Sequence, residues 1–213
     1  NSRQNARTEE GTPRSTKLSS AFFQGTVGFK DHTTLNIYGR NDWNSTLVYT
    51  DGHGIYSYFY PGADLAFVFS DALNISKKVL NFGKLRLSYA QVGGGASEPY
   101  QVRIPSYAPY SPYVDFAGNS IIRYGLAGNE IIDQNFVPVR NTKLEGGLEF
   151  KLFSNRLGGD FTVYTQNSER QIILFDIPSE SGAAKTRING GKLRNAGIEL
   201  TLYGSPVKKS DFS

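Results

Sequence analysis

Hydrophobic and polar residues alternate along several segments of the chain, which is the period of a β-strand with one apolar and one polar face. The first such segment includes Phe23, and after Asp31 and His32 the period resumes at Leu35. Two strands joined by a very short turn are therefore predicted. The apolar series is Phe23, Gly25, Val27, Phe29, Leu35 and Ile37, and the polar series is Gln24, Thr26, Gly28, Lys30, Asn36, Tyr38 and Arg40.

The same alternation predicts five further strands, at residues 57–70, 83–92, 143–152, 157–171 and around 198–203. Several of them are about as long as a strand that crosses a bilayer. Alternation alone does not distinguish a membrane barrel from a β-sandwich, because both have one apolar and one polar face per strand.

The lengths of the connections separate these two possibilities better than the strands do. Short links near Asp31, Ser154 and Gly204 alternate with long ones. Short turns at one end and long extracellular loops at the other are typical of outer-membrane barrels. We expect the long loops near residues 41–56, 93–140 and 172–191.

Residues 1–20 form a polar stretch that we interpret as a loop or a strand extension, and residues 21–213 as one barrel segment of about seven or eight strands. The chain starts without Met or a signal peptide and stops where another strand is expected to begin. We therefore expect a fragment of a larger all-β protein, made of antiparallel strands.

Composition narrows the possible functions. The chain has no Cys and no Met but contains 23 Gly, 13 Tyr and 14 Phe, which favours strands and tight turns and excludes disulfides. The net charge of +4 is spread along the chain without a basic run, so a nucleic-acid partner is not expected. No run of about 18 apolar residues predicts a spanning helix.

Catalytic chemistry has little support in the sequence. His32 and His53 lie in predicted turns without a partner for nucleophilic catalysis. Glu145 and Glu149 share one face of a strand at a separation of about 13 Å, too far apart for a glycosidase pair, and the same face carries Lys side chains. We expect a protein that is not an enzyme and has no cofactor or metal site.

Aromatic residues collect at predicted strand ends and in the long loop at residues 93–140, which is rich in Tyr and Pro. Such rings can stack on sugars or hold apolar peptide side chains, although a loop that packs on itself explains them equally well. The candidate substrate-binding residues are Arg40, Trp43, Tyr107, Tyr110 and Tyr113.

Several strings in one order resemble a known family. They are GRNDW at residues 39–43, SYFYP at 57–61, FGKLRLSYAQVG at 82–93, SNRL at 154–157 and NAGIEL at 195–200. In this order and spacing, over residues 20–213, the chain is similar to the C-terminal part of the barrel of SusC/RagA-family TonB-dependent outer-membrane transporters.

This resemblance implies a plugged barrel of about 22 strands in the Gram-negative outer membrane. It implies active import of oligosaccharides or peptides with a SusD-like surface lipoprotein, and it allows a dimer of such pairs. TonB would act through a plug and a TonB-binding segment that we expect outside this sequence.

The runner-up interpretation is a soluble or surface-attached β-sandwich that binds carbohydrate, with the same apolar residues forming an internal core. The transporter interpretation instead expects a set of apolar residues to face lipid. That set is Leu35, Ile37, Leu85, Leu87, Leu148, Phe150, Leu200 and Leu202.

Overall fold

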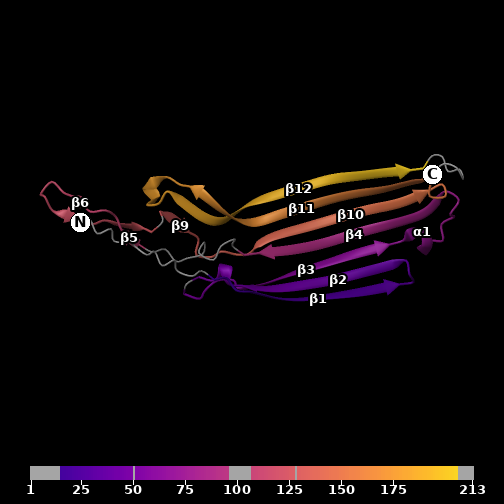
Figure 1. Ribbon diagram of the computed structural model, residues 1–213, viewed down its shortest axis with the longest axis horizontal. Coiled ribbons are helices and arrows are strands. Elements are labelled where there is room, and N and C mark those ends of the chain that lie inside the picture. The colour runs from indigo at the N-terminus through magenta and orange to yellow at the C-terminus, as the bar shows by residue number, and fades with distance from the viewer. Residues whose placement is uncertain (1–14, 50, 96–106, 128, 206–213) are drawn as a thin grey trace, which may run out of the picture.

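The computed structural model describes residues 15–49, 51–95, 107–127 and 129–205, which are mostly β-strands (Figure 1). One large sheet has the strand order β1-β2-β3-β4-β10-β11-β12-β9, and all its pairs are antiparallel except β12 with β9. The long strands are β1 (Leu18–Phe29), β2 (Thr33–Asn44), β3 (Ser57–Phe67), β4 (Leu80–Gly94), β10 (Val139–Leu152), β11 (Leu157–Asp176) and β12 (Lys185–Gly204).

The connections at the two ends of the sheet differ, as Figure 1 shows. At one end, short turns follow β1 and β10, and the short helix α1 (Phe69–Ala72) lies between β3 and β4. At the other end are longer segments with their own elements. These are the 3-10 helices η1 (Ser45–Leu47) and η3 (Ser179–Ser181), β9 (Glu130–Ile132), and two small sheets that pair β5 (Tyr107–Pro109) with β8 (Tyr124–Leu126) and β6 (Tyr113–Val114) with β7 (Ser120–Ile121).

The register of the sheet separates an apolar face from a polar face, because directly opposed residues point to the same side. One cross-strand row is Val27, Leu35, Leu65, Leu87, Gly146, Val163 and Ile198. The next row, on the other side, is Thr26, Asn36, Asp64, Ser88, Glu145, Tyr164 and Gly197. All eight residues that the sequence predicts to face lipid lie on the apolar face.

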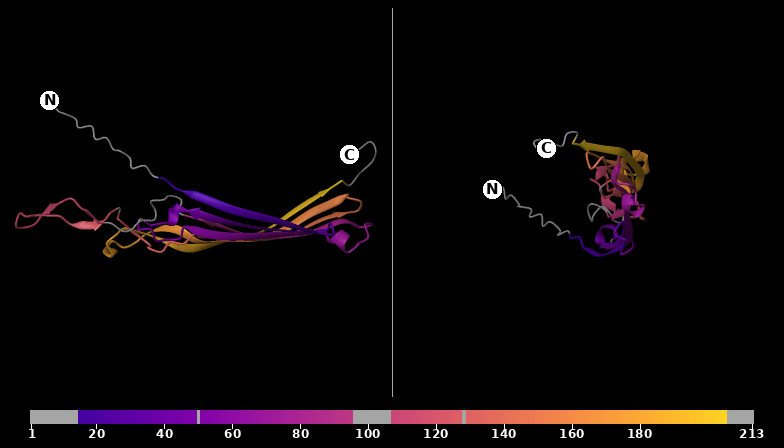
Figure 2. Two further views of the ribbon diagram at one scale, coloured as in Figure 1. Left: turned by 90° about the horizontal axis from the view of Figure 1, so that it is seen from below. Right: turned by 90° about the vertical axis from the view of Figure 1, so that its right-hand side faces the viewer.

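The sheet curves across its strands like part of a cylinder wall, and no second layer covers its apolar face within the described residues (Figure 2). Apolar side chains on that face are therefore exposed, with Ile198 at 72% and Leu200 at 61%. A sheet with one bare apolar face needs an apolar surrounding, which a bilayer supplies to a barrel. Among the described residues no helix has the length and apolar content required to cross a membrane.

The buried hydrophobic core lies at the loop end of the molecule rather than on a face of the long strands. We call it the loop core: Leu47 and Tyr49 from the β2–β3 loop pack with Ile132 and Phe136 from the β4–β10 segment, and Ile172 of β11 lies against them. The four loop residues are at most 4% exposed. This core ties two connections, far apart in sequence, to the end of the sheet.

Several predicted boundaries differ from the structure, including the start of the loop expected at residues 41–56, since β2 runs to Asn44. The strand expected to run to residue 70 ends at Phe67, because Phe69–Ala72 turns into α1. The long loop expected at residues 172–191 is mostly strand, since β11 continues to Asp176 and β12 begins at Lys185. Of the polar segment 1–20, residues 1–14 lie outside the described part of the chain, and Leu18 already begins β1.

Candidate ligand-binding site

A hollow of about 450 Å³ opens on the polar face where β1, β2 and β3 approach their loop end. Cross-strand pairing places Phe22, Arg40 and Tyr60 in one row of that face and Gln24 and Tyr38 in the next. We call these five residues the ring-lined site. Three aromatic rings, one guanidinium and one amide thus converge from three neighbouring strands.

Arg40 is held in position by its neighbours. Its Nε donates to Asp42 Oδ1 at 2.7 Å and its Nη2 to Ser20 Oγ at 2.9 Å, while the Tyr60 hydroxyl donates to the other Asp42 oxygen. Asp42 is only 6% exposed, whereas the Arg40 side chain is 46% exposed. A guanidinium has five N–H donors, so Arg40 keeps donors for a ligand after these two bonds.

The rings of the site are unusual for a polar face. Phe22 is 81% exposed there, and a large apolar side chain on a polar surface is an informative exception. The Tyr38 ring lies over Gly62, where any Cβ would overlap it. Exposed rings beside a positioned cation can stack on a sugar face or a peptide side chain while the cation binds an oxygen atom.

The structure separates the two predicted residues of β2. Arg40 belongs to the ring-lined site, but Trp43 is an odd number of positions away and lies on the apolar face. There it shares a face with Phe23 and Phe59, whose rings close over Gly39. An aromatic cluster at the end of an apolar face suits a membrane interface.

The three predicted tyrosines lie elsewhere again. Residues 107–126, which we call the arm, form the two small sheets and extend beyond the loop end of the large sheet (Figure 1). Tyr107 is 70% exposed, Tyr110 packs on Gly125, and the Arg123 guanidinium lies 5.1 Å from the centre of the Tyr113 ring. The arm therefore displays its rings outward, and the structure does not bring them to Arg40.

The loop core is closed by a polar clasp around His53. The imidazole stacks on the Tyr49 ring at 4.1 Å, and its Nδ1 lies 2.5 Å from Asp51 Oδ1 and its Nε2 2.9 Å from the Gln134 carbonyl oxygen. The Tyr49 hydroxyl donates to the Asp133 carbonyl at 2.5 Å and accepts from the Phe136 N–H at 3.1 Å.

The clasp is expected to respond to pH. The Gln134 carbonyl, followed by Asp51, raises the pKa of His53 above its ordinary value of 6.5, because both ring nitrogens face oxygen acceptors and only the protonated ring donates to both. The stabilisation that protonated His53 gives to the folded loop core is complete below about pH 6.5 and is lost as pH rises through the raised pKa of His53. We expect hydrogen exchange in residues 129–138, corrected for intrinsic rates, to be faster at high pH, and this difference to disappear in His53→Gln.

Two carboxylates elsewhere on the polar face, Asp160 and Glu145, form ion pairs. Arg86 of β4 reaches across Gly147 of β10 to Asp160 of β11, with Nη2 at 2.7 and 2.5 Å from the two carboxylate oxygens. Glu145 pairs with Lys143 at 2.7 Å. The Arg86–Asp160 pair therefore braces β4 against β11 across β10, whereas the Lys143–Glu145 pair lies along β10 itself.

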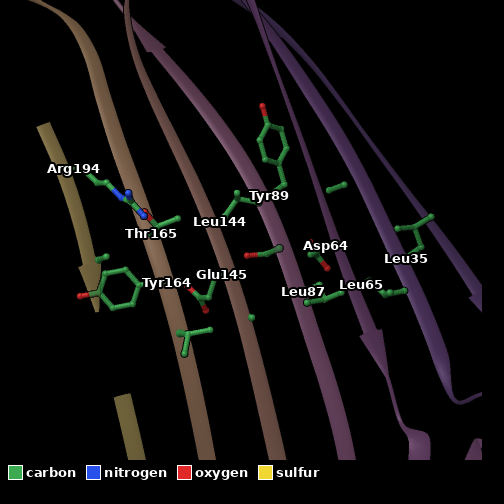
Figure 3. A pocket seen from close by; sticks show the side chains of 15 residues that line it. Leu35, Asp64, Leu65, Leu87, Tyr89, Leu144, Glu145, Tyr164, Thr165 and Arg194 are labelled. Carbon is green, nitrogen blue, oxygen red and sulfur yellow. The ribbon is translucent and has the colours of Figure 1, made fainter. Parts of the chain in front are cut away.

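A larger hollow, of about 640 Å³, lies on the apolar face and is shown in Figure 3. Leu35, Leu65, Leu87 and Leu144 surround a shallow depression left by small residues of the neighbouring strands. Its lining is almost entirely apolar, as expected for wall that contacts hydrocarbon, and we do not assign it to ligand binding.

The long strands form one open antiparallel sheet that is apolar on one side and ion-paired on the other. Short turns lie at one end of this sheet and structured loops at the other. These features define a segment of a membrane β-barrel wall. The chain belongs to the TonB-dependent receptor-like β-barrel family, whose model matches residues 2–213. Membership in a family of receptors agrees with the prediction that the chain is not an enzyme.

Individual relatives agree with the family. The chain is 25% identical over 199 residues to TonB-dependent receptor P26 of Formosa agariphila, covering 92% of this chain and 19% of that protein. It is 23% identical over 198 residues to receptor P3 of the same organism, covering 93% and 19%. Its fold resembles a chain of the RagAB peptide transporter, with a TM-score of 0.69 and 19% identity over 92% of this chain and 20% of that one.

These comparisons confirm the predicted all-β barrel and the resemblance to SusC/RagA-type transporters. The runner-up interpretation, a β-sandwich, is wrong, because the family is a barrel family and the described residues form one open layer. The chain spans about a fifth of the length of the curated relatives it matches.

Proposed function

We propose that this chain forms part of the wall of a TonB-dependent importer in the outer membrane of Gram-negative bacteria. Family membership and the one-sided apolar sheet support this assignment. In it the apolar face contacts lipid, the polar face lines the lumen, and the loop core and arm lie on the extracellular side. TonB would act through parts of the protein other than these residues.

The ligand that we propose is an oligosaccharide or a peptide that contacts the ring-lined site on its way through the lumen. The observation that carries this proposal is the exposed Phe22 on the polar face, next to an Arg40 that Asp42 and Ser20 hold in place. Aromatic rings and a guanidinium suit both ligand classes, since both present apolar surfaces together with hydrogen-bonding oxygens.

The arm is proposed to contact either the ligand or a SusD-like surface lipoprotein, through Tyr107, Tyr110 and Tyr113. Its support is the outward display of these rings beyond the sheet, since exposed aromatic side chains are enriched at recognition surfaces. Similarity to a chain of the RagAB peptide transporter is compatible with a lipoprotein partner. A dimer of such pairs also belongs to this proposal.

The ring-lined site is tested by exchanging Phe22 in the full-length transporter. Phe22→Ser is expected to lower ligand uptake about tenfold at unchanged outer-membrane abundance, because the ligand loses its contact with the Phe22 ring. Phe22→Tyr keeps the ring and is the matched control. Uptake by Phe22→Ser equal to that of the control would contradict a role for this site.

A further inference from the structure

Toward the loop end of the sheet, β3 and β4 separate while both are still extended strands. Their pairing runs only from Phe67–Leu85 to Gly62–Ala90, although β4 continues to Gly94 and stays paired with β10. Figure 1 shows the two strands diverging toward the loop end. We call this opening the split.

Pro61 explains where the split begins. Asn44 N donates to Tyr56 O, so even-numbered residues of β3 bond to β2 and odd-numbered residues face β4. Residue 61 would make the next bond to β4, but proline has no N–H to donate. The proline at position 61 therefore accounts for the point at which β3 and β4 separate.

A cavity of about 250 Å³ occupies the split, lined among others by Tyr58, Tyr60, Gln91, Arg140 and Arg170. Tyr60 and Gln91 also line the hollow of the ring-lined site, so the two spaces are neighbours.

Two positively charged hydrogen-bond donors, Arg140 and Arg170, line this cavity. Beyond Ala90 the same alternation directs the N–H groups of Gln91 and Gly93 toward the side from which β3 has separated. In the described part of the chain neither Arg140 nor Arg170 forms a direct ion pair. Glu169 attracts both arginines electrostatically, but its carboxylate contacts Lys192, at 2.8 Å.

Arg170 is placed by an unusual backbone. The β11–β12 ladder omits the pair of Arg170 with Gly191, and both have positive φ, at 60° and 76°. The Asn189 side chain supports this kink by donating to the Arg170 carbonyl at 2.7 Å. A positive φ is unfavourable for any residue other than glycine, and such strained residues collect at binding sites.

We propose that the split is a subsite for an anionic group, a carboxylate or a sulfate, on the ligand of the ring-lined site. Two guanidinium groups, and two backbone N–H groups that the separation leaves without a partner in β3, are donors that such oxyanions prefer. The inference rests on the proposed import function and narrows it to acidic ligands, such as a uronate-containing or sulfated oligosaccharide or a peptide with a free carboxylate.

The first test uses selenate, a sulfate analogue with an anomalous signal, on crystals of the full-length transporter. We expect selenate in the split within hydrogen-bonding distance of both guanidinium groups, and its loss in R140Q/R170Q. The control Lys30→Gln, at the opposite end of the sheet, should keep it. An empty split in the native protein, or selenate retained by the double variant, would overturn the proposal.

The second test separates the ligand sources by displacement. Trigalacturonate and tetraalanine with a free carboxylate are compared with trigalactose and with amidated tetraalanine. The acidic member of one pair is expected to displace selenate at a concentration about tenfold lower than its neutral counterpart. If neither acid displaces it, the split holds only inorganic anions and the ligand proposal fails. Selenate binding does not require transport, so the Phe22 uptake test can fail independently.

Discussion

Replacing Leu148 with arginine is expected to destabilise the full-length barrel in a bilayer by about 2–4 kcal/mol. Leu148 of β10 pairs with Leu85 of β4 and Phe161 of β11, so its side chain lies in an apolar row of the sheet. A charged group there has neither water nor an ion partner when the face contacts hydrocarbon. The free energy of unfolding in lipid vesicles measures this cost.

The neighbouring residue supplies the matched control. Glu149 lies opposite Lys84 and Asp160 in the strand register, on the polar face. The positive charge of Glu149→Arg would therefore lie in the lumen. We expect this variant to lose less than about 1 kcal/mol. Equal costs for the two arginines would show that Leu148 does not face lipid, and would refute the assigned sides of the sheet.

Tyr49→Ala is expected to release the loop core, at a cost of about 3–5 kcal/mol in its local opening free energy. Tyr49 is 3% exposed, stacks on His53, and bonds through its hydroxyl to the backbone of Asp133 and Phe136. Its loss leaves both a void and two unsatisfied backbone groups. Hydrogen exchange in residues 129–138 reports this opening.

Tyr49→Phe distinguishes packing from hydrogen bonding at the same position. It keeps the ring but leaves the Phe136 N–H and the Asp133 carbonyl without their partner, for which we expect about 1–3 kcal/mol. Unchanged exchange in Tyr49→Ala would mean that residues 129–138 are held mainly by other contacts, such as the bonds between Val137 and Asn189.

The strands were predictable because alternation needs no knowledge of distant partners. Leu85 and Leu148, for example, belong to apolar series that the sequence shows separately and the register then joins. The outer parts of β11 and β12 were not predictable in this way. Consecutive apolar residues at 172–175 and glycines at 190–191 break the period of two, and their pairing is visible only when both strands are present.

The site was predictable only in part. Arg40 was found from its place at the end of a strand, and counting positions would have shown that Trp43 points the other way. Phe22, Tyr38 and Tyr60 were missed as a group because their convergence depends on the register among three strands. Their signal in the sequence is an aromatic residue in a polar series.

The strict two-face register also limits how genes of this family can change in length. Inserting one codon after Gly147 in β10 would reverse the faces on one side of the insertion: either Glu149 moves to the lipid side and Leu148 into the lumen, or Lys143 and Glu145 move to the lipid side and Leu144 into the lumen. Inserting two codons would preserve the faces. We expect length variation within wall strands to occur in even steps, whereas the arm, which pairs only with itself, can vary freely.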